Sequence, residues 1–235
     1  MKKERLDKLI ASQGLLSRSD VKNMVRCGEV SVNGIVVKDS SLKVTYEDDI
    51  KIKGESLLQT EFTYIMLNKP KGVVSASEDK RDKTVVDILP DDLKRKNLFP
   101  AGRLDKNTTG LLLLTNDGAT AHRLTSPKHH VDKVYAFTVK FPISEEDVKA
   151  LCRGVTLEDG YETLPCTVEM LSEREGRITL REGKYHQIKR MMIAVHNQIT
   201  SLTRISYGPL TTKGLSEGQW RYLTDEEIKL ITNNN

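Results

Sequence analysis

The chain has 235 residues, of which 37% are hydrophobic and 30% are charged, and its formal net charge is +4 at pH 7. This composition is typical of a water-soluble globular protein, and no apolar run approaches the roughly 18 residues of a membrane span. The three cysteines are odd in number and widely spaced, which argues against a disulfide framework or a zinc site. We therefore expect a cytoplasmic protein that holds no metal and binds no membrane.

Apolar residues at helical spacing predict two helices within the first thirty residues. Gly14 ends the first helix, and Ser17 with Asp20 forms the pattern of a capping box at the start of the second. The apolar faces of the two helices consist of Leu6, Leu9, Ile10, Val21, Met24 and Val25.

The period then changes to the alternation of strands. Residues 30–32 and 35–37 alternate around Asn33-Gly34, a pair that is typical of a type I′ hairpin turn. A third strand is expected near residues 49–53, and the following stretch to Thr63 indicates a linker. We place a first domain at residues 1–58, a linker at 59–63 and a larger domain at 64–232.

Basic charge is concentrated in two parts of the chain. Residues 1–26 hold seven Lys and Arg against three Asp and Glu, and residues 181–204 hold five against one. Clustered basic charge favours a polyanion as partner, although ordinary solvated faces are the alternative. Candidate polyanion-binding residues on the polar faces of the first two helices are Lys8, Arg18, Lys22 and Arg26.

Strands and helices alternate in the larger domain without a strict repeat. This pattern predicts an α+β fold with a mixed, largely antiparallel sheet and flanking helices. Strands are expected at residues 62–67, 73–75, 111–114, 134–141, 167–170 and 177–181, and helices at 84–88, 119–125, 144–153 and 188–195.

A charged turn lies directly before the most apolar strand. Gly102-Arg103-Leu104-Asp105 leads through Gly110 into four consecutive leucines, as expected for a strand buried on both faces. Asp105 and Arg103 are therefore fixed at the edge of a rigid element, which makes Asp105 a candidate catalytic carboxylate. The alternative at this point is an Asp that caps a turn and an Arg that pairs with it at the surface.

Four motifs, in this order along the chain, resemble those of pseudouridine synthases. Residues 68–72 (Asn-Lys-Pro-Lys-Gly) resemble the family's early strand-and-turn segment, and residues 102–111 resemble its aspartate signature. Residues 133–135 (Lys-Val-Tyr) are similar to its tyrosine motif, and residues 184–191 (Lys-Tyr-His-Gln-Ile-Lys-Arg-Met) to its last basic motif. The first 58 residues resemble the S4 RNA-binding domain, also called α-L.

The resemblance implies isomerisation of a uridine to pseudouridine in RNA, without cofactor or metal. Asp105 would be the catalytic carboxylate, Lys189 its cationic partner, and Tyr135 would stack on the target base. Whether the Asp attacks C1′ or the base, or assists elimination at C2′, stays open. Leu202 would pack on the other face of the uracil, and Arg103 would fill the space that the flipped base leaves. Further RNA-contacting residues that the resemblance implies are Thr108, Thr109, His186, Gln187 and Arg190.

Within the family, the chain resembles the branch that modifies small-subunit ribosomal RNA, whose usual target is uridine 516 of 16S rRNA. Residues 125–130 (Thr-Ser-Pro-Lys-His-His) and Lys189 carry this resemblance, since other branches have Arg at the latter position. Tyr207 departs from the aliphatic residue more common at its position. The expected partner of the monomeric chain is 16S rRNA or a small-subunit assembly intermediate. A 23S rRNA synthase and a non-catalytic rRNA-binding assembly factor are the alternatives.

Overall fold

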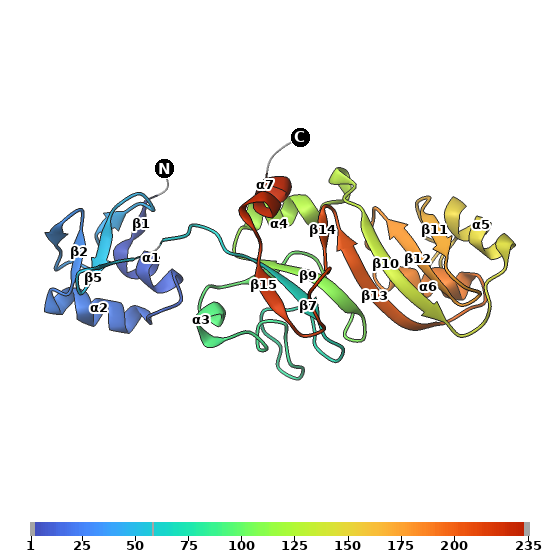
Figure 1. Cartoon of the computed structure of the whole chain (residues 1–235), viewed down its shortest axis with the longest axis horizontal. Coiled ribbons are helices and arrows are strands. Elements are labelled where there is room, and N and C mark those ends of the chain that lie inside the picture. The colour runs from blue at the N-terminus through green and yellow to red at the C-terminus, as the bar shows by residue number, and fades with distance from the viewer. Residues whose placement is uncertain (1–2, 58, 233–235) are drawn as a thin grey trace. The chain divides into compact units, whose positions relative to one another are not determined.

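The computed structural model describes residues 3–57 and 59–232, and the chain divides into two compact units (Figure 1). The first unit runs to Thr63 and also takes in residues 86–99, while the second comprises residues 64–85 and the chain from Pro100 onward. Nothing in the sequence indicates that residues 86–99 belong to the first unit. The predicted boundaries of the domains and linker stay a prediction.

Two helices and a small antiparallel sheet make up most of the first unit. The sheet has the strand order β3-β2-β5-β6, and β1 pairs separately with β4. The elements are β1 Glu4–Arg5, α1 Leu6–Ser12, α2 Arg18–Cys27, β2 Val30–Val32, β3 Ile35–Val36, β4 Lys43–Val44, β5 Ile50–Ile52, β6 Glu55–Ser56 and α3 Asp91–Lys94.

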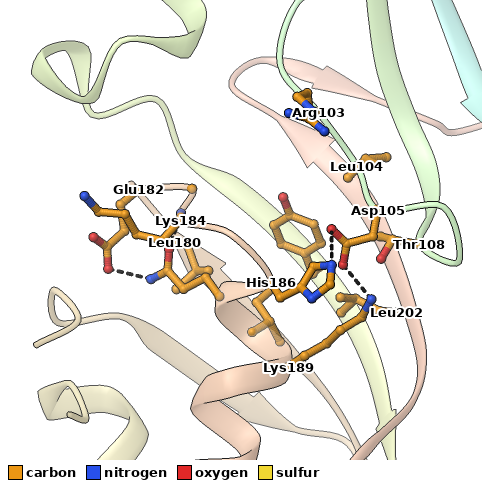
Figure 2. Close-up of a pocket in the computed structure, with 14 residues that line it drawn as sticks. Arg103, Leu104, Asp105, Thr108, Leu180, Glu182, Lys184, His186, Lys189 and Leu202 are labelled. Atoms are coloured by element: carbon orange, nitrogen blue, oxygen red, sulfur yellow. Dashed lines mark hydrogen bonds and ion pairs between the residues drawn. The ribbon is translucent and has the colours of Figure 1, made fainter. Parts of the chain in front are cut away.

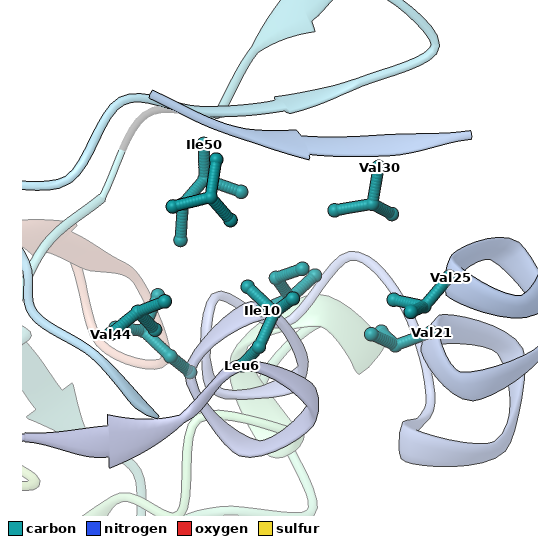
Figure 3. Packing of buried hydrophobic residues seen from close by; sticks show 9 residues of the cluster. Leu6, Ile10, Val21, Val25, Val30, Val44 and Ile50 are labelled. Carbon is teal, nitrogen blue, oxygen red and sulfur yellow. The ribbon is translucent and has the colours of Figure 1, made fainter. Parts of the chain in front are cut away.

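Side chains from both helices and from the sheet form one apolar core in this unit (Figure 3). Leu6 and Val21 are fully buried on the helices, and Ile50 is fully buried on the sheet. The predicted capping box is confirmed, because Ser17 and Asp20 each bond to the other's backbone N–H. The predicted I′ turn is confirmed by positive φ values of 51° at Asn33 and 80° at Gly34.

One nine-stranded mixed sheet organises the second unit. Its main path is β11-β12-β10-β13-β9-β7-β15, with β14 beside β13 and β8 beside β9. Of the strand pairs in the described sheet whose register is established, only β13 and β9 run parallel, so the predicted largely antiparallel α+β fold is confirmed. The strands are β7 Tyr64–Lys69, β8 Phe99–Pro100, β9 Thr109–Thr115, β10 Lys133–Val139, β11 Thr167–Met170, β12 Glu175–Leu180, β13 Ile199–Tyr207, β14 Leu210–Thr211 and β15 Trp220–Tyr222.

Helices flank this sheet. Leu111 to Leu114 are fully buried in the middle of it, as the four-leucine run predicts. None of the helices in the described part of the chain is long and apolar enough to span a membrane. The helical elements are α4 Gly118–Thr125, the 3-10 helix Pro127–His129, α5 Glu145–Arg153, α6 Gln187–Ala194 and α7 Asp225–Thr232.

Two predicted elements are wrong, and both lie between β7 and β8. Residues 73–75 form no strand; Val74 makes only an isolated bridge to Thr84. Residues 85–88 form turns where a helix was expected, and the short helix comes three residues later at α3. Periodicity misleads here because the backbone of this segment is irregular although some of its apolar side chains are buried. Val85, for example, is fully buried.

Candidate active site

The loop that carries Asp105 is held from behind by a buried lysine. Lys69, at the end of β7, has no exposed surface, and its Nζ donates to the carbonyl oxygens of Thr108 (2.9 Å), Lys106 (3.2 Å) and Pro70 (3.1 Å). Burial lowers the pKa of Lys69 to about 8. Ser75 adds a second anchor, because its Oγ bonds both the N–H and the carbonyl oxygen of Leu104. The backbone around Asp105 is thus fixed on both sides.

Asp105 faces Lys189 and His186 across a small cavity of about 80 Å³ (Figure 2). Nζ of Lys189, on α6, donates to Oδ2 of Asp105 at 2.5 Å. Nε2 of His186 lies 3.5 Å from the other carboxylate oxygen. The side chains of Asp105 and Lys189 are 26% and 30% exposed, so the pair is shielded from water but reachable.

The sheet supplies the apolar part of this cavity. Tyr135 lies on β10 and Leu202 on β13, and both are less than a tenth exposed. They share one face of the sheet, because Leu202 is the register partner of Phe137, two residues after Tyr135. An aromatic ring and an aliphatic side chain beside an ion-paired carboxylate can hold a flat heterocycle against a reactive group.

His186 has an unusual backbone and a stacked ring. It is the N-cap of α6 in the left-handed conformation (φ 48°), and its imidazole stacks on Tyr185 with ring centroids 3.9 Å apart. Left-handed backbone in a non-glycine residue is uncommon and clusters at functional sites. This conformation presents the imidazole to Asp105, while the Tyr185 side chain is 76% exposed and outside the cavity lining.

Most of the candidate residues from the sequence line this one cavity. They are Arg103, Asp105, Thr108, Tyr135, His186, Gln187, Lys189 and Leu202. The Oγ1 of Thr108 is buried and has no partner within the described chain, so it can bond a ligand. The amide of Gln187 is instead used internally, since it bonds Glu182 and the N–H of Lys184.

Of the candidate residues in the second unit, two lie outside the cavity lining. Thr109 bonds Thr203 across the junction of β9 and β13, with 2.8 Å between the hydroxyl oxygens. Arg190 points away and pairs with Asp159 at 2.6 Å and with Glu158 at 3.4 Å. No group of three or more His, Cys, Asp or Glu side chains in the described part of the chain is placed to hold a metal ion.

The basic candidate residues of the first unit differ in whether their charged groups have partners within the protein. Arg18 and Arg5 both pair with Asp7, which is fully buried, and the hydrogen bond from Arg5 holds the pKa of Asp7 below its usual value. Lys8 pairs with Glu4, and Arg26 donates to Asn23. Lys22 is exposed and has no partner among the described residues.

Sequence reasoning missed the residues that support the site from behind. Lys69 and Ser75 belong to the early strand-and-turn region, yet nothing in local spacing shows that they reach the Asp105 loop. Arg204 was also missed: it is only 1% exposed, and its Nε donates to the carbonyl oxygen of Leu111. The one available signal was the Lys-Pro pair at the end of an apolar strand.

Comparison with known proteins agrees with this geometry. The family described as RNA pseudouridylate synthase matches residues 63–194, and the S4 domain family matches residues 4–50. The chain is 46% identical over 233 residues to the uncharacterized RNA pseudouridine synthase YtzG of Bacillus subtilis, covering 97% of this chain and 98% of that protein. It is 39% identical over 230 residues to ribosomal small subunit pseudouridine synthase A of Escherichia coli, covering 97% and 99%.

A solved structure supports the same assignment. A crystal structure of a pseudouridylate synthase is 39% identical in sequence, has a TM-score of 0.69, and covers 97% of this chain and all of that one. The matches thus extend over both units and not over one motif alone. The chain belongs to the RNA pseudouridylate synthase family, as a member with an S4 domain at its N-terminal end.

Proposed function

We propose that this enzyme converts one uridine of ribosomal RNA to pseudouridine, at uridine 516 of 16S rRNA, with Asp105 as the catalytic carboxylate. The observation that carries the proposal is the Asp105–Lys189 ion pair in a cavity walled by Tyr135 and Leu202. The name of the E. coli relative, a small-subunit synthase that matches the chain from end to end, supports the choice of RNA.

The reaction rearranges one nucleotide without a net change in composition. The glycosidic bond between N1 and C1′ breaks, the uracil turns, and a bond forms between C5 and C1′. The proton on C5 leaves and N1 ends with a proton, so no oxidant, reductant or metal takes part. A carboxylate can serve by attacking C1′, by attacking the ring or by assisting loss of the proton on C2′.

Each proposed role has a physical basis in the cavity. Lys189 compensates the charge of Asp105 while the group is shielded from water. Tyr135 and Leu202 provide two apolar surfaces for the uracil, and Tyr135 can carry a proton late in the reaction. Arg103 is exposed and has no partner among the described residues, so its planar guanidinium is free to replace the flipped base in the RNA.

The first unit would hold the RNA while the second acts on it. Only 5% of the residues are aromatic, which argues against broad stacking on single strands and favours recognition by shape and phosphate contacts. Removing residues 1–58 is a poor test, because residues 86–99 belong to the same compact unit and would lose their packing. Charge-removing point substitutions on α2 are the better probe.

The deciding experiment maps pseudouridine in unmodified 16S and 23S transcripts, and in partly assembled small subunits, after incubation with wild type or Asp105→Asn. One new pseudouridine at position 516 of 16S rRNA, absent with the variant, is expected. A site in 23S rRNA would keep the chemistry and overturn the target. No new site in any of these RNAs would favour an rRNA-binding assembly factor. Cytoplasmic location and action as a monomer stay predictions.

A further inference from the structure

A second, larger cavity adjoins the catalytic one and is strongly basic. It measures about 510 Å³ and shares Arg103, Tyr135, Glu182 and Lys184 with the catalytic cavity. Its lining holds five Lys and Arg side chains against a single Glu. We call it the basic cavity, and it includes Lys133 and Arg204 on the two strands that also carry Tyr135 and Leu202.

The sheet register places these charges directly beside Tyr135. Arg204 is the register partner of Tyr135, and Tyr207 is the partner of Lys133, so all four residues lie on one face. A register shift between Val134 and Tyr135 keeps both pairs on this face. The cationic surface therefore continues from the proposed uracil slot along the same two strands.

Arg204 is a buried guanidinium whose hydrogen bonds are incomplete. Its Nε donates to the carbonyl oxygen of Leu111 at 2.7 Å, and its Cζ lies 4.6 Å from the ring centroid of Tyr207. Its Nη2 is buried and has no partner within the described chain. A buried charged group without a partner is costly, so such a group in a native protein calls for an explanation.

Lys133 adds a second cation, which forms no salt bridge within the described residues. Its Nζ lies 5.4 Å from the ring centroid of Tyr207 and donates to the carbonyl oxygen of Val131, which leaves two of its three N–H groups free. Burial, together with the charge of Arg204, lowers the pKa of Lys133 to about 8.

The nearby carboxylates already have partners. Glu182 accepts bonds from Tyr161, Leu164 and Gln187. Asp132 pairs with Arg181, with 2.9 Å between Oδ1 and Nε. Within the described chain, neither Glu182 nor Asp132 makes a salt bridge to Lys133 or Arg204, although the charge of Asp132 acts on Lys133.

We propose that the basic cavity binds a phosphate group of the RNA backbone next to the target uridine, with Arg204 and Lys133 as its ligands. This assignment rests on the proposed function, because it takes the catalytic cavity as the uridine site. A nucleotide whose base lies between Tyr135 and Leu202 carries phosphates on both sides of its ribose, and the basic cavity opens directly beside it. Guanidinium and ammonium groups are the usual protein ligands of phosphate.

Lys133→Gln is the substitution that tests this assignment, because replacing Arg204 would also break its bond to Leu111. Lys133→Arg should restore the contact. Lys140→Gln is a matched control: this lysine lies just after the end of β10, beside the ring of Phe141 and outside both cavities.

The primary measurement is the affinity for unmodified 16S transcript as a function of salt concentration. Loss of one phosphate contact should weaken binding roughly fivefold at physiological salt and reduce the slope of log affinity against log salt by about 0.7 to 0.9. The KM should rise while the single-turnover rate at saturating RNA stays unchanged, since the phosphate has the same charge throughout the reaction. Lys133→Arg and Lys140→Gln should behave like wild type.

Three results would overturn the assignment. The first is a wild-type slope and affinity in Lys133→Gln. The second is an equal loss in Lys140→Gln, which would indicate general surface charge. The third combines two observations: millimolar inorganic phosphate stabilises the wild type thermally but not Lys133→Gln, and the slope of log RNA affinity against log salt is the same in both. That result would assign the cavity to a small free anion.

Failure of the proposed function is a separate outcome. Affinity and its salt dependence need no turnover and are measured on 16S and 23S transcripts in parallel. An enzyme that makes no pseudouridine in either RNA, but loses one phosphate contact in Lys133→Gln, would refute the proposed reaction and keep the phosphate site.

Discussion

The ammonium of Lys189 lies 2.5 Å from a carboxylate oxygen of Asp105, although 84 positions separate the two residues in the chain. Asp105 belongs to the loop before β9, and Lys189 belongs to α6. The same carboxylate has His186 on its other side, 3.5 Å away. The arrangement gives Asp105 a fixed orientation and a compensated charge, and the first two predictions follow from it.

Asp105→Asn should abolish turnover while leaving RNA affinity and fold nearly unchanged. The amide keeps the shape but supplies neither a nucleophile nor a base, and losses of about 10⁴-fold or more are typical for such groups. Single-turnover pseudouridine formation and filter binding measure the two effects. Asp82→Asn is the matched control, because Asp82 pairs with Lys106 at 2.6 Å on the surface and should be dispensable. Equal losses in both variants would contradict a catalytic role for Asp105.

Lys189→Met should reduce the single-turnover rate by roughly 10² to 10³-fold, because the carboxylate loses its compensating charge. Lys189→Arg keeps that charge and should retain most of the rate, with a changed hydrogen-bond geometry. Arg190→Gln serves as the neighbouring control on the same helix, since its guanidinium pairs with Glu158 and Asp159 and not with Asp105. A wild-type rate in Lys189→Met would remove the ion pair from the mechanism.

Lys69→Met should destabilise the protein and slow the reaction without changing RNA affinity. Two hydrogen bonds to the Asp105 loop and one to Pro70 are lost, at about 1 kcal/mol each, and relief of the buried charge offsets part of this. We expect a net loss of roughly 1 to 3 kcal/mol in the free energy of unfolding at pH 7, measured by urea denaturation. An unchanged free energy of unfolding would show that water replaces the lysine as donor to the three carbonyl oxygens.

The same lysine predicts a pH dependence of stability. Its pKa is about 8 in the native state and near 10.5 in the unfolded chain, so between these values the unfolded state holds more protons. The contribution of Lys69 to stability should therefore rise with pH from about 8 towards 10. Lys133 contributes a similar rise, because its pKa is also about 8. Lys69→Met should remove one of the two contributions, and a wild-type pH profile in this variant would contradict the assignment.

Gly110→Ala should be strongly destabilising. An added Cβ would lie 2.2 Å from the carbonyl oxygen of Arg204, and the φ of +105° is unfavourable for any other residue. We expect a loss of about 3 kcal/mol or more in the free energy of unfolding. Gly118→Ala, at the first residue of α4 with open space around it, should be neutral or stabilising by up to about 1 kcal/mol. Thermal unfolding of the pair provides the measurement.

Lys22→Gln should raise the KM for RNA without changing the melting temperature, because this exposed lysine has no protein partner within the described residues. Arg18→Gln should lower the melting temperature instead, since it removes one of the two partners of the buried Asp7. If Lys22→Gln leaves the KM unchanged, this face of α2 does not meet the RNA.

Local chemistry explains which parts of the fold could be predicted. Ser17 with Asp20 and Asn33 with Gly34 act within a few residues, so the sequence displays them directly. The four-leucine run likewise follows the Asp105 loop directly in the sequence, so it indicated where that loop is held. Lys69 and Arg204 act through space on loops and strands far along the chain, and an isolated Lys or Arg in an apolar strand carries no sign of its partner.

The same limit applies to the segment between β7 and β8. Val85 is fully buried, but its neighbours follow neither a helical nor a strand period. Only the contacts of the folded chain assign residues 86–99 to the first unit. The grouping of Tyr135, Leu202 and Lys189 around Asp105 likewise came from family resemblance and not from spacing in the sequence.

The parallel junction of β9 with β13 gives the site a mechanical property. Only two residue pairs join these strands, Thr109 with Thr203 and Gly110 with Arg204, supplemented by a hydroxyl contact and the bond from Arg204 to Leu111. Asp105 belongs to one side of this seam, and the slot walls Tyr135 and Leu202 belong to the other. The distance between the two sides of the site is therefore constrained by fewer residue pairs here than at the neighbouring junctions, β7 with β9 and β10 with β13.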